Sequence, residues 1–185
     1  MASNKRSNLF LLDYVGLILV LLLLIVVFSL YTENFFTAIN FRTIVNQTPD
    51  AVVIAVGMTF VLIIAGIDLS VGSVLGLSAA VLAVGLHRFG WPMPLAIAAS
   101  LGMGLLCGLL NGLMVITWRL PAFIVTLGML EIARGGAYLV TSTRSVYIGT
   151  QLGDFVSMRV GGISMMVFIA VLVVAAGQIV LSMTA

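Results

Sequence analysis

The stretch Gly66-Ile67-Asp68-Leu69-Ser70-Val71-Gly72-Ser73 interrupts an apolar part of the chain, between the runs Ala51–Ala65 and Val71–Leu86. An acidic side chain inside a bilayer is costly, so Asp68 is expected to have a function or a structural partner there. Glycine and serine allow a helix to stop and restart at membrane depth. We therefore predict a helix break at Gly66–Ser73, with four candidate residues: Gly66, Asp68, Ser70 and Gly72.

The composition is that of a membrane protein. Of the 185 residues, 62% are hydrophobic and only 8% are charged, whereas a soluble domain carries roughly 25% charged residues. Too few charges remain to solvate a water-facing surface. The net charge of +2 is scattered along the chain, so nucleic-acid binding is not expected. The single cysteine, Cys107, cannot form a disulfide within the chain.

Six apolar segments approach the length of about 20 residues that a bilayer-spanning helix needs. The first lacks a signal-peptide cleavage site and is predicted to be a retained membrane helix. The sequence thus predicts an all-α, polytopic transmembrane helical bundle that forms one permease-like domain over residues 1–185. The six expected helices are Tyr14–Tyr31, Ala51–Ala65, Val71–Leu86, Leu95–Thr117, Ala122–Val140 and Ile163–Met183.

The connections between these helices predict an orientation. Lys5-Arg6 favours a cytoplasmic N-terminus, although alternation then leaves four arginines outside. Polar connectors are expected at Glu33–Asp50 and Thr141–Gly162, both on the outer side. A tight turn is expected at Arg119-Leu120-Pro121.

Small residues recur every four positions along the fourth expected helix, at Ser100, Gly104, Gly108 and Gly112. Such a ridge lets helix backbones approach closely in lipid. Gly72 and Gly76 have the same spacing in the third expected helix. The ridge either packs within the bundle or lines a transport path.

Polar residues within the apolar segments have alternative interpretations. Glu131 and Arg134 are three residues apart and share a helix face, so they form either a structural ion pair or a site in which Arg134 contacts a partner helix or the path. Asp68 is an alternative partner for Arg134. Asp68 otherwise caps the restarting helix, contacts a solute, or couples transport to protons. Asn111 is either an interhelical hydrogen bonder or a solute ligand.

The sequence contains no residues arranged for catalysis or metal binding. There is no phosphate-binding loop, and Lys5 is the only lysine. His87 is the only histidine, which excludes a histidine metal cluster and a Ser-His-Asp triad. We therefore expect neither an enzyme nor a bound cofactor, and any energy for transport would come from a partner subunit or an ion gradient.

The motifs resemble those of the membrane permease of bacterial ABC importers for ribose, xylose and related sugars, within the superfamily that includes branched-chain amino acid permeases. The Gly-Ile-Asp-Leu-Ser-Val-Gly motif is typical of the sugar branch. The matching stretches occur in the family's order over most of the chain: Asn34–Thr37, Ala55–Thr59, Gly66–Ser73, Asn111-Gly112, Leu120–Gly128 and Arg134-Gly135. Glu131 has no counterpart in the resemblance.

The resemblance implies a sugar permease in the bacterial inner membrane. It also implies a second permease subunit, a cytoplasmic ATP-binding subunit that hydrolyses ATP, and a periplasmic sugar-binding protein. Family members continue after the sixth helix into a loop that docks the ATPase, so the sequence is expected to be the N-terminal portion of a permease. The rival interpretations are an ion-coupled transporter or channel, and a non-transporting remnant that pairs with an intact permease.

Overall fold

The computed structural model describes residues 3–148 and 150–184. Within these ranges the chain forms eight helices and one small β-hairpin, so the all-α prediction is confirmed. The chain divides into two compact units, Met1–Gln47 and Thr48–Ala185. The assignment of residues 1–185 to one permease domain stays a prediction.

The first unit contains two helices, α1 (Ser3–Tyr31) and α2 (Ala38–Gln47). The side chains of Lys5 and Arg6, on which the predicted orientation rests, lie outside the described residues. The prediction of a polar connector at Glu33–Asp50 is wrong in its centre, because α2 occupies residues 38–47 there. Its N-cap is Thr37, whose hydroxyl accepts a hydrogen bond from the Asn40 backbone N–H at 3.3 Å.

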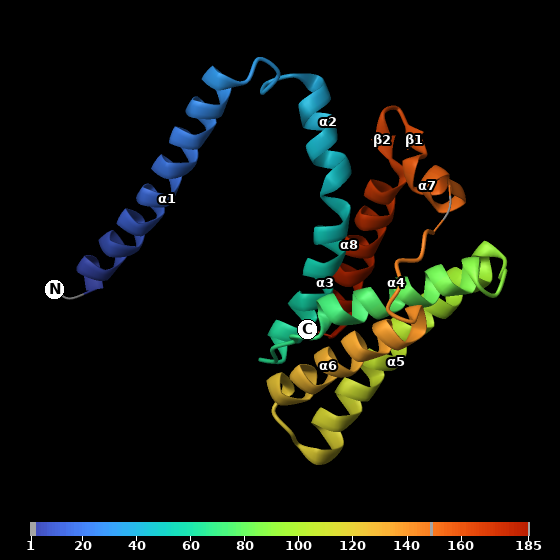
Figure 1. The fold of residues 1–185 in the computed structure, drawn as a ribbon. Helices are drawn as coiled ribbons and strands as arrows, with labels where there is room; N and C mark the ends of the chain where they lie inside the picture. The colour runs from blue at the N-terminus through green and yellow to red at the C-terminus, as the bar shows by residue number, and fades with distance from the viewer. Residues whose placement is uncertain (1–2, 149, 185) are drawn as a thin grey trace. The chain divides into compact units, whose positions relative to one another are not determined.

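The second unit contains the remaining elements (Figure 1). Five of the six predicted helices lie in this unit, and each boundary is within two residues of the prediction. In chain order the elements are α3 (Pro49–Ile63), α4 (Val71–His87), α5 (Met93–Trp118), α6 (Ala122–Thr141), α7 (Thr150–Ser157), β1 (Arg159–Val160), β2 (Ile163–Ser164) and α8 (Met165–Thr184).

The last predicted helix begins later than expected. Ile163 and Ser164 pair with β1 in an antiparallel hairpin instead of starting the helix. The Ser164 hydroxyl accepts a hydrogen bond from the Met166 backbone N–H at 3.3 Å and so caps α8. The predicted polar loop at Thr141–Gly162 therefore contains regular structure, namely α7 and β1.

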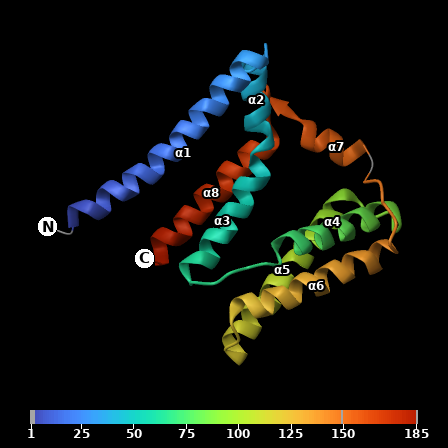
Figure 2. The same ribbon diagram turned by 60° about the vertical axis from the view of Figure 1, so that its left-hand side comes forward.

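Helices α4, α5 and α6 pack against one another, and α3 packs against α8 (Figures 1 and 2). The core of the three-helix group consists of Leu77, Cys107, Met129 and Ala133. Most large apolar side chains outside this core are exposed. Leu105, for example, is 74% exposed and Leu172 is 68% exposed. Exposed apolar faces of this extent are what a helix surrounded by lipid presents.

Three of the described helices, α5, α6 and α8, are long and apolar enough to cross a membrane. Helices α2 and α3 give a fourth span if they are counted as one broken segment. Helix α4 and the Val15–Tyr31 part of α1 are apolar but shorter. The prediction of a multi-pass membrane protein is therefore confirmed.

The small-residue ridge on α5 packs only at one end. Ser100 donates a hydrogen bond to the Ser78 carbonyl at 2.8 Å, and a Cβ on Gly104 would lie 3.5 Å from the Ser78 hydroxyl. A Cβ on Gly108 or Gly112 would meet nothing within 4 Å. The packing interpretation therefore holds for the Ser100–Gly104 end of the ridge and fails for the other end within this chain.

Candidate functional site

The break predicted at Gly66–Ser73 is present between α3 and α4, over residues 64–70. Helix α3 ends with Ala65 in the left-handed conformation, at φ 55°. The Ala65 N–H bonds the Leu62 carbonyl and the Gly66 N–H bonds the Val61 carbonyl, both at 2.9 Å. This is the hydrogen-bond pattern of a Schellman motif, with alanine at the position that usually holds glycine.

Close packing favours glycine at position 66. A Cβ at this position would lie 3.1 Å from Val61 Cγ1 and 3.2 Å from the Val61 carbonyl oxygen. The constraint comes from neighbouring atoms, because the φ of Gly66 is not in the left-handed region. Gly72, by contrast, is exposed on α4, and a Cβ there would meet nothing within 4 Å. Of the two candidate glycines in the break motif, only Gly66 is sterically constrained.

Asp68 lies two residues before α4 and is half-buried. Its Oδ1 accepts hydrogen bonds from the Ser70 backbone N–H and from the Ser70 hydroxyl, each at 2.7 Å. Ser70, the N-cap residue of α4, makes no capping bond with its own side chain. Asp68 thus satisfies one of the backbone donors that the start of a helix leaves free.

Ser70 and Asn111 connect the break to α5. Ser70 is 1% exposed and Asn111 is 8% exposed. The Asn111 Nδ2 donates to the Ser70 hydroxyl at 3.2 Å, and its Oδ1 is buried without a hydrogen-bond partner among the described residues. Asp68, Ser70 and Asn111 therefore form one hydrogen-bonded chain from the break into the helix group.

Thr126 connects the other side of the break to α6. Its hydroxyl accepts a hydrogen bond from the Leu69 backbone N–H and donates to the Ile67 carbonyl, both at 3.1 Å. Thr126 is 4% exposed. We did not single out this residue from the sequence. The available signal was its place as a hydroxyl residue in the otherwise apolar start of α6.

The position of the break explains why these bonds are needed. Asn111 precedes the end of α5 at Trp118 by about two helical turns, or roughly 10 Å. Helix α4 has 17 residues and is therefore only roughly 26 Å long, shorter than the bilayer core of about 30 Å. The location of the break at membrane depth stays a prediction, and at that depth every backbone group would need a protein partner.

Glu131 and Arg134 lie on α6, and the Arg134 Nη1 is 3.5 Å from the Glu131 Oε1. The Arg134 side chain is 55% exposed and the Glu131 side chain is 67% exposed. In the described residues Arg134 pairs with Glu131, whereas Asp68 bonds with Ser70. The structure thus brings together Gly66, Asp68, Ser70 and Asn111, but not Arg134, which lies on an outward face of α6.

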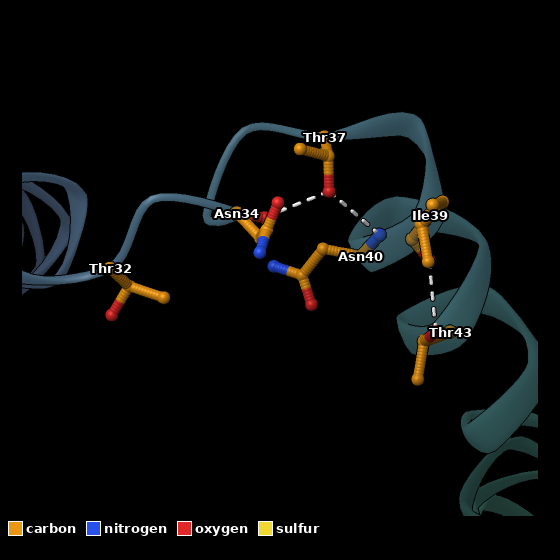
Figure 3. A pocket seen from close by; sticks show the side chains of 6 residues that line it. All are labelled: Thr32, Asn34, Thr37, Ile39, Asn40 and Thr43. Atoms are coloured by element: carbon orange, nitrogen blue, oxygen red, sulfur yellow. Dashed lines mark hydrogen bonds between the residues drawn. The ribbon is translucent and has the colours of Figure 1, made fainter.

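A shallow polar cavity of about 320 Å³ lies in the first unit, at the turn between α1 and α2 (Figure 3). Its polar lining comes from Thr32, Asn34, Thr37, Asn40 and Thr43. The Thr37 hydroxyl donates to the Asn34 carbonyl at 2.8 Å, so the lining residues also hold the turn. None of the described side chains in the lining is charged.

The fold and the break together define the class of protein, a multi-pass α-helical membrane protein with an interrupted helix. The family model described as "Branched-chain amino acid transport system / permease component" matches residues 40–185. The chain therefore belongs to this family of transport permease components, and membership implies a non-catalytic subunit.

Named relatives lie in the sugar branch. The chain is 39% identical to the ribose import permease protein RbsC of Haemophilus influenzae, over 80% of this chain and 47% of that protein. It is 38% identical to the xylose transport system permease protein XylH of Escherichia coli K12, over 78% of this chain and 40% of that protein. It is 36% identical to the fructose import permease protein FrcC of Rhizobium meliloti, over 71% of this chain and 37% of that protein. The chain thus spans less than half the length of these relatives. No solved structure matches it.

Proposed function

We propose that the chain supplies part of the translocation path of an ABC-type sugar importer in the bacterial inner membrane. Membership of the permease family and the names of the ribose, xylose and fructose relatives support this assignment. The transported solute would be a monosaccharide of the ribose, xylose or galactose type. It would cross unchanged by alternating access, in which the path opens to each side of the membrane in turn.

The partners follow from the same proposal. A periplasmic sugar-binding protein delivers the sugar, a second permease subunit completes the path, and a cytoplasmic ATP-binding subunit hydrolyses ATP. The sequence has no phosphate-binding loop of its own, so ATP would act on the partner and no cofactor would bind here. The outer connections, including Thr141–Gly162, would face the binding protein.

The observation that carries the proposal is the half-buried carboxylate of Asp68 in a rigid helix break. Both of its hydrogen bonds to Ser70 use Oδ1, which leaves Oδ2 available to accept a hydrogen bond from a sugar hydroxyl. Asn111 donates to the Ser70 hydroxyl, and Thr126 accepts from the Leu69 backbone N–H. A fixed acceptor at membrane depth is suited to binding a polar solute during transport.

Uptake of labelled sugar tests this proposal. The chain would be expressed with the remaining segment of a ribose-permease relative, the ATP-binding subunit and the binding protein, in cells that lack their own permease. We expect ATP-dependent uptake of ribose, xylose or fructose. Uptake that needs a proton gradient but no ATP-binding subunit would favour an ion-coupled transporter instead. If no uptake occurs although the chain is captured with an intact permease, the non-transporting interpretation would be supported.

Two matched variants test the site itself. Asp68→Asn keeps the acceptor for Ser70 but removes the charge, and we expect uptake to fall by about tenfold or more, the size of effect that a lost charge-assisted hydrogen bond gives. Glu131→Gln removes a charge from an exposed position on α6 outside the break, keeps an acceptor for Arg134, and should leave uptake unchanged. Equal uptake by both variants, at equal protein levels, would remove Asp68 from the proposed path.

A further inference from the structure

A basic cavity of about 480 Å³ lies at the end of the bundle where α4 and α6 finish. His87 and Arg88 come from the end of α4, and Arg144 comes from the segment after α6. Hydroxyl groups of Thr141, Ser145 and Tyr147 complete the polar lining. None of the described side chains in the lining is acidic. The cavity is separate from the break, and part of its lining belongs to the Thr141–Gly162 connection that the proposed function places toward the binding protein.

The positive charge of this cavity exceeds what the helix ends need. The C-termini of α4 and α6 each carry the equivalent of roughly half a negative charge. Arg88 and Arg144 contribute two positive charges, so roughly one positive charge remains after both helix ends are neutralised. Arg88 is held toward the segment after α6 by a hydrogen bond from its Nη1 to the Ser142 hydroxyl, at 3.5 Å. The cavity therefore carries a net positive charge, which is complementary to an anionic ligand.

The surroundings of the cavity indicate the membrane–water interface. Phe89 and Trp91 stack with ring centroids 5.5 Å apart, directly after Arg88. Tyr138 lies one turn before Thr141 on α6 and is 59% exposed. Tryptophan and tyrosine concentrate where lipid headgroups meet the hydrocarbon core. The exposed side chains of Phe89 and Tyr138 are close in the sequence to lining residues. The basic cavity with these neighbours therefore offers contacts for both parts of an amphiphile.

We propose that this cavity binds the phosphate-bearing headgroup of an anionic phospholipid. The arginines and hydroxyls would donate hydrogen bonds to the phosphate oxygens, and Phe89 and Tyr138 would lie along the upper part of the acyl chains. A soluble partner with acidic side chains would use the charge but not the apolar border, so the lipid fits more of the observed surface. The bound lipid would link the end of α4 to the segment after α6.

Native mass spectrometry of the purified 185-residue chain in detergent tests this proposal. The chain is titrated with dioleoyl phosphatidylglycerol, with dioleoyl phosphatidylcholine, and with inorganic phosphate as a separate arm. We expect preferential retention of phosphatidylglycerol. The double variant Arg88→Gln/Arg144→Gln should weaken phosphatidylglycerol binding by about 30-fold, because each arginine near an anionic surface contributes about fivefold. Arg119→Gln, the same change at the α5–α6 turn, should alter it by less than twofold.

Further arms separate the alternatives. Arg88→Lys/Arg144→Lys keeps the charge and should retain the lipid, which guards against a misfolded glutamine variant. Equal retention of the two lipids, or an equal loss in Arg119→Gln, would overturn the proposal. Saturation by inorganic phosphate alone, without a lipid preference, would assign the site to a free anion. If the double variant lost capture of the sugar-binding protein but kept the lipid preference, the cavity would be a protein docking site instead.

Discussion

The break between α3 and α4 and the turn between α5 and α6 both interrupt apolar helices within a few residues. Each contains a non-glycine residue in the left-handed conformation, Ala65 at φ 55° and Arg119 at φ 54°. Their surroundings differ. The break is held by bonds from Asp68, Asn111 and Thr126, whereas the turn exposes Arg119.

The predicted difference between the two is one of depth in the membrane. A turn at the interface can leave its backbone groups to water, so proline and an exposed arginine are sufficient. A break inside the hydrocarbon core has no access to water. Each backbone group left there without a hydrogen bond costs on the order of several kcal/mol of free energy. At the break, Thr126 of α6 bonds the backbone of Leu69 and Ile67, and Asp68 accepts from the Ser70 backbone N–H. The same local conformation is therefore a simple connection in one place and a built site in the other.

The largest effect is expected for Thr126→Val, which keeps the shape but removes the hydroxyl. The Leu69 N–H and the Ile67 carbonyl both lose their partner. At about 1–3 kcal/mol for each of the two orphaned groups, we expect the free energy of unfolding to fall by about 2–6 kcal/mol. Thr117→Val, beside the α5–α6 turn, should change it by less than about 0.5 kcal/mol. Reversible unfolding in mixed micelles, followed by circular dichroism, measures both. Similar losses at the two positions would erase the distinction between break and turn.

Asp68 separates the capping role from a role in transport. Asp68→Ala removes both bonds to Ser70 and should lower the free energy of unfolding by about 1–3 kcal/mol. Asp68→Asn retains an acceptor at Oδ1 and should lower it by less than about 1 kcal/mol. The same unfolding titration compares them. If the asparagine variant were as unstable as the alanine variant, charge rather than hydrogen bonding would hold the start of α4.

Gly66 and Gly72 test whether the break is tightly packed. Gly66→Ala places a Cβ about 3.1 Å from Val61 Cγ1, and we expect a loss of about 1–2 kcal/mol from this overpacking. Gly72→Ala, in the open on α4, should instead gain about 0.5–1 kcal/mol of helix propensity. Thermal unfolding of the two variants in the same detergent gives the comparison. A gain at Gly66 would mean that the Val61 contact relaxes at little cost.

The helices and the break were predictable because both depend on local composition. Long apolar runs define the helices, and one acid with glycines and serines between two such runs marks the interruption. Proline at residue 121 placed the α5–α6 turn correctly, since proline cannot continue a helix. The prediction failed at α2, where a threonine cap outweighed a polar composition, and at β2, where Ser164 delays the start of α8.

The partners of the break were harder to predict because they are far away in the sequence. Thr126 bonds to residues 57 and 59 positions earlier, and no local pattern distinguishes it from other threonines. The same holds for close-packed glycines. A Cβ on Gly85 would contact Trp91 and one on Gly177 would contact Val56. Among the described residues, a Cβ on Gly108 or Gly112 would meet no atom within 4 Å. Spacing predicts a face, but only the fold determines what covers it.

The smallest effect compares the two left-handed residues directly, through Ala65→Gly and Arg119→Gly. A left-handed non-glycine residue costs roughly 1–2 kcal/mol, and glycine removes this cost. Glycine also stabilises the unfolded chain by about 0.5–1 kcal/mol of backbone entropy, so each variant should gain about 0–1.5 kcal/mol. The two gains should be equal within error in the unfolding titration, because both residues have the same φ. A clear loss for Ala65→Gly alone would show that the alanine methyl group contributes packing at the break. The backbone conformation would then be part of what distinguishes the break from the turn, in addition to the side chains that hold it.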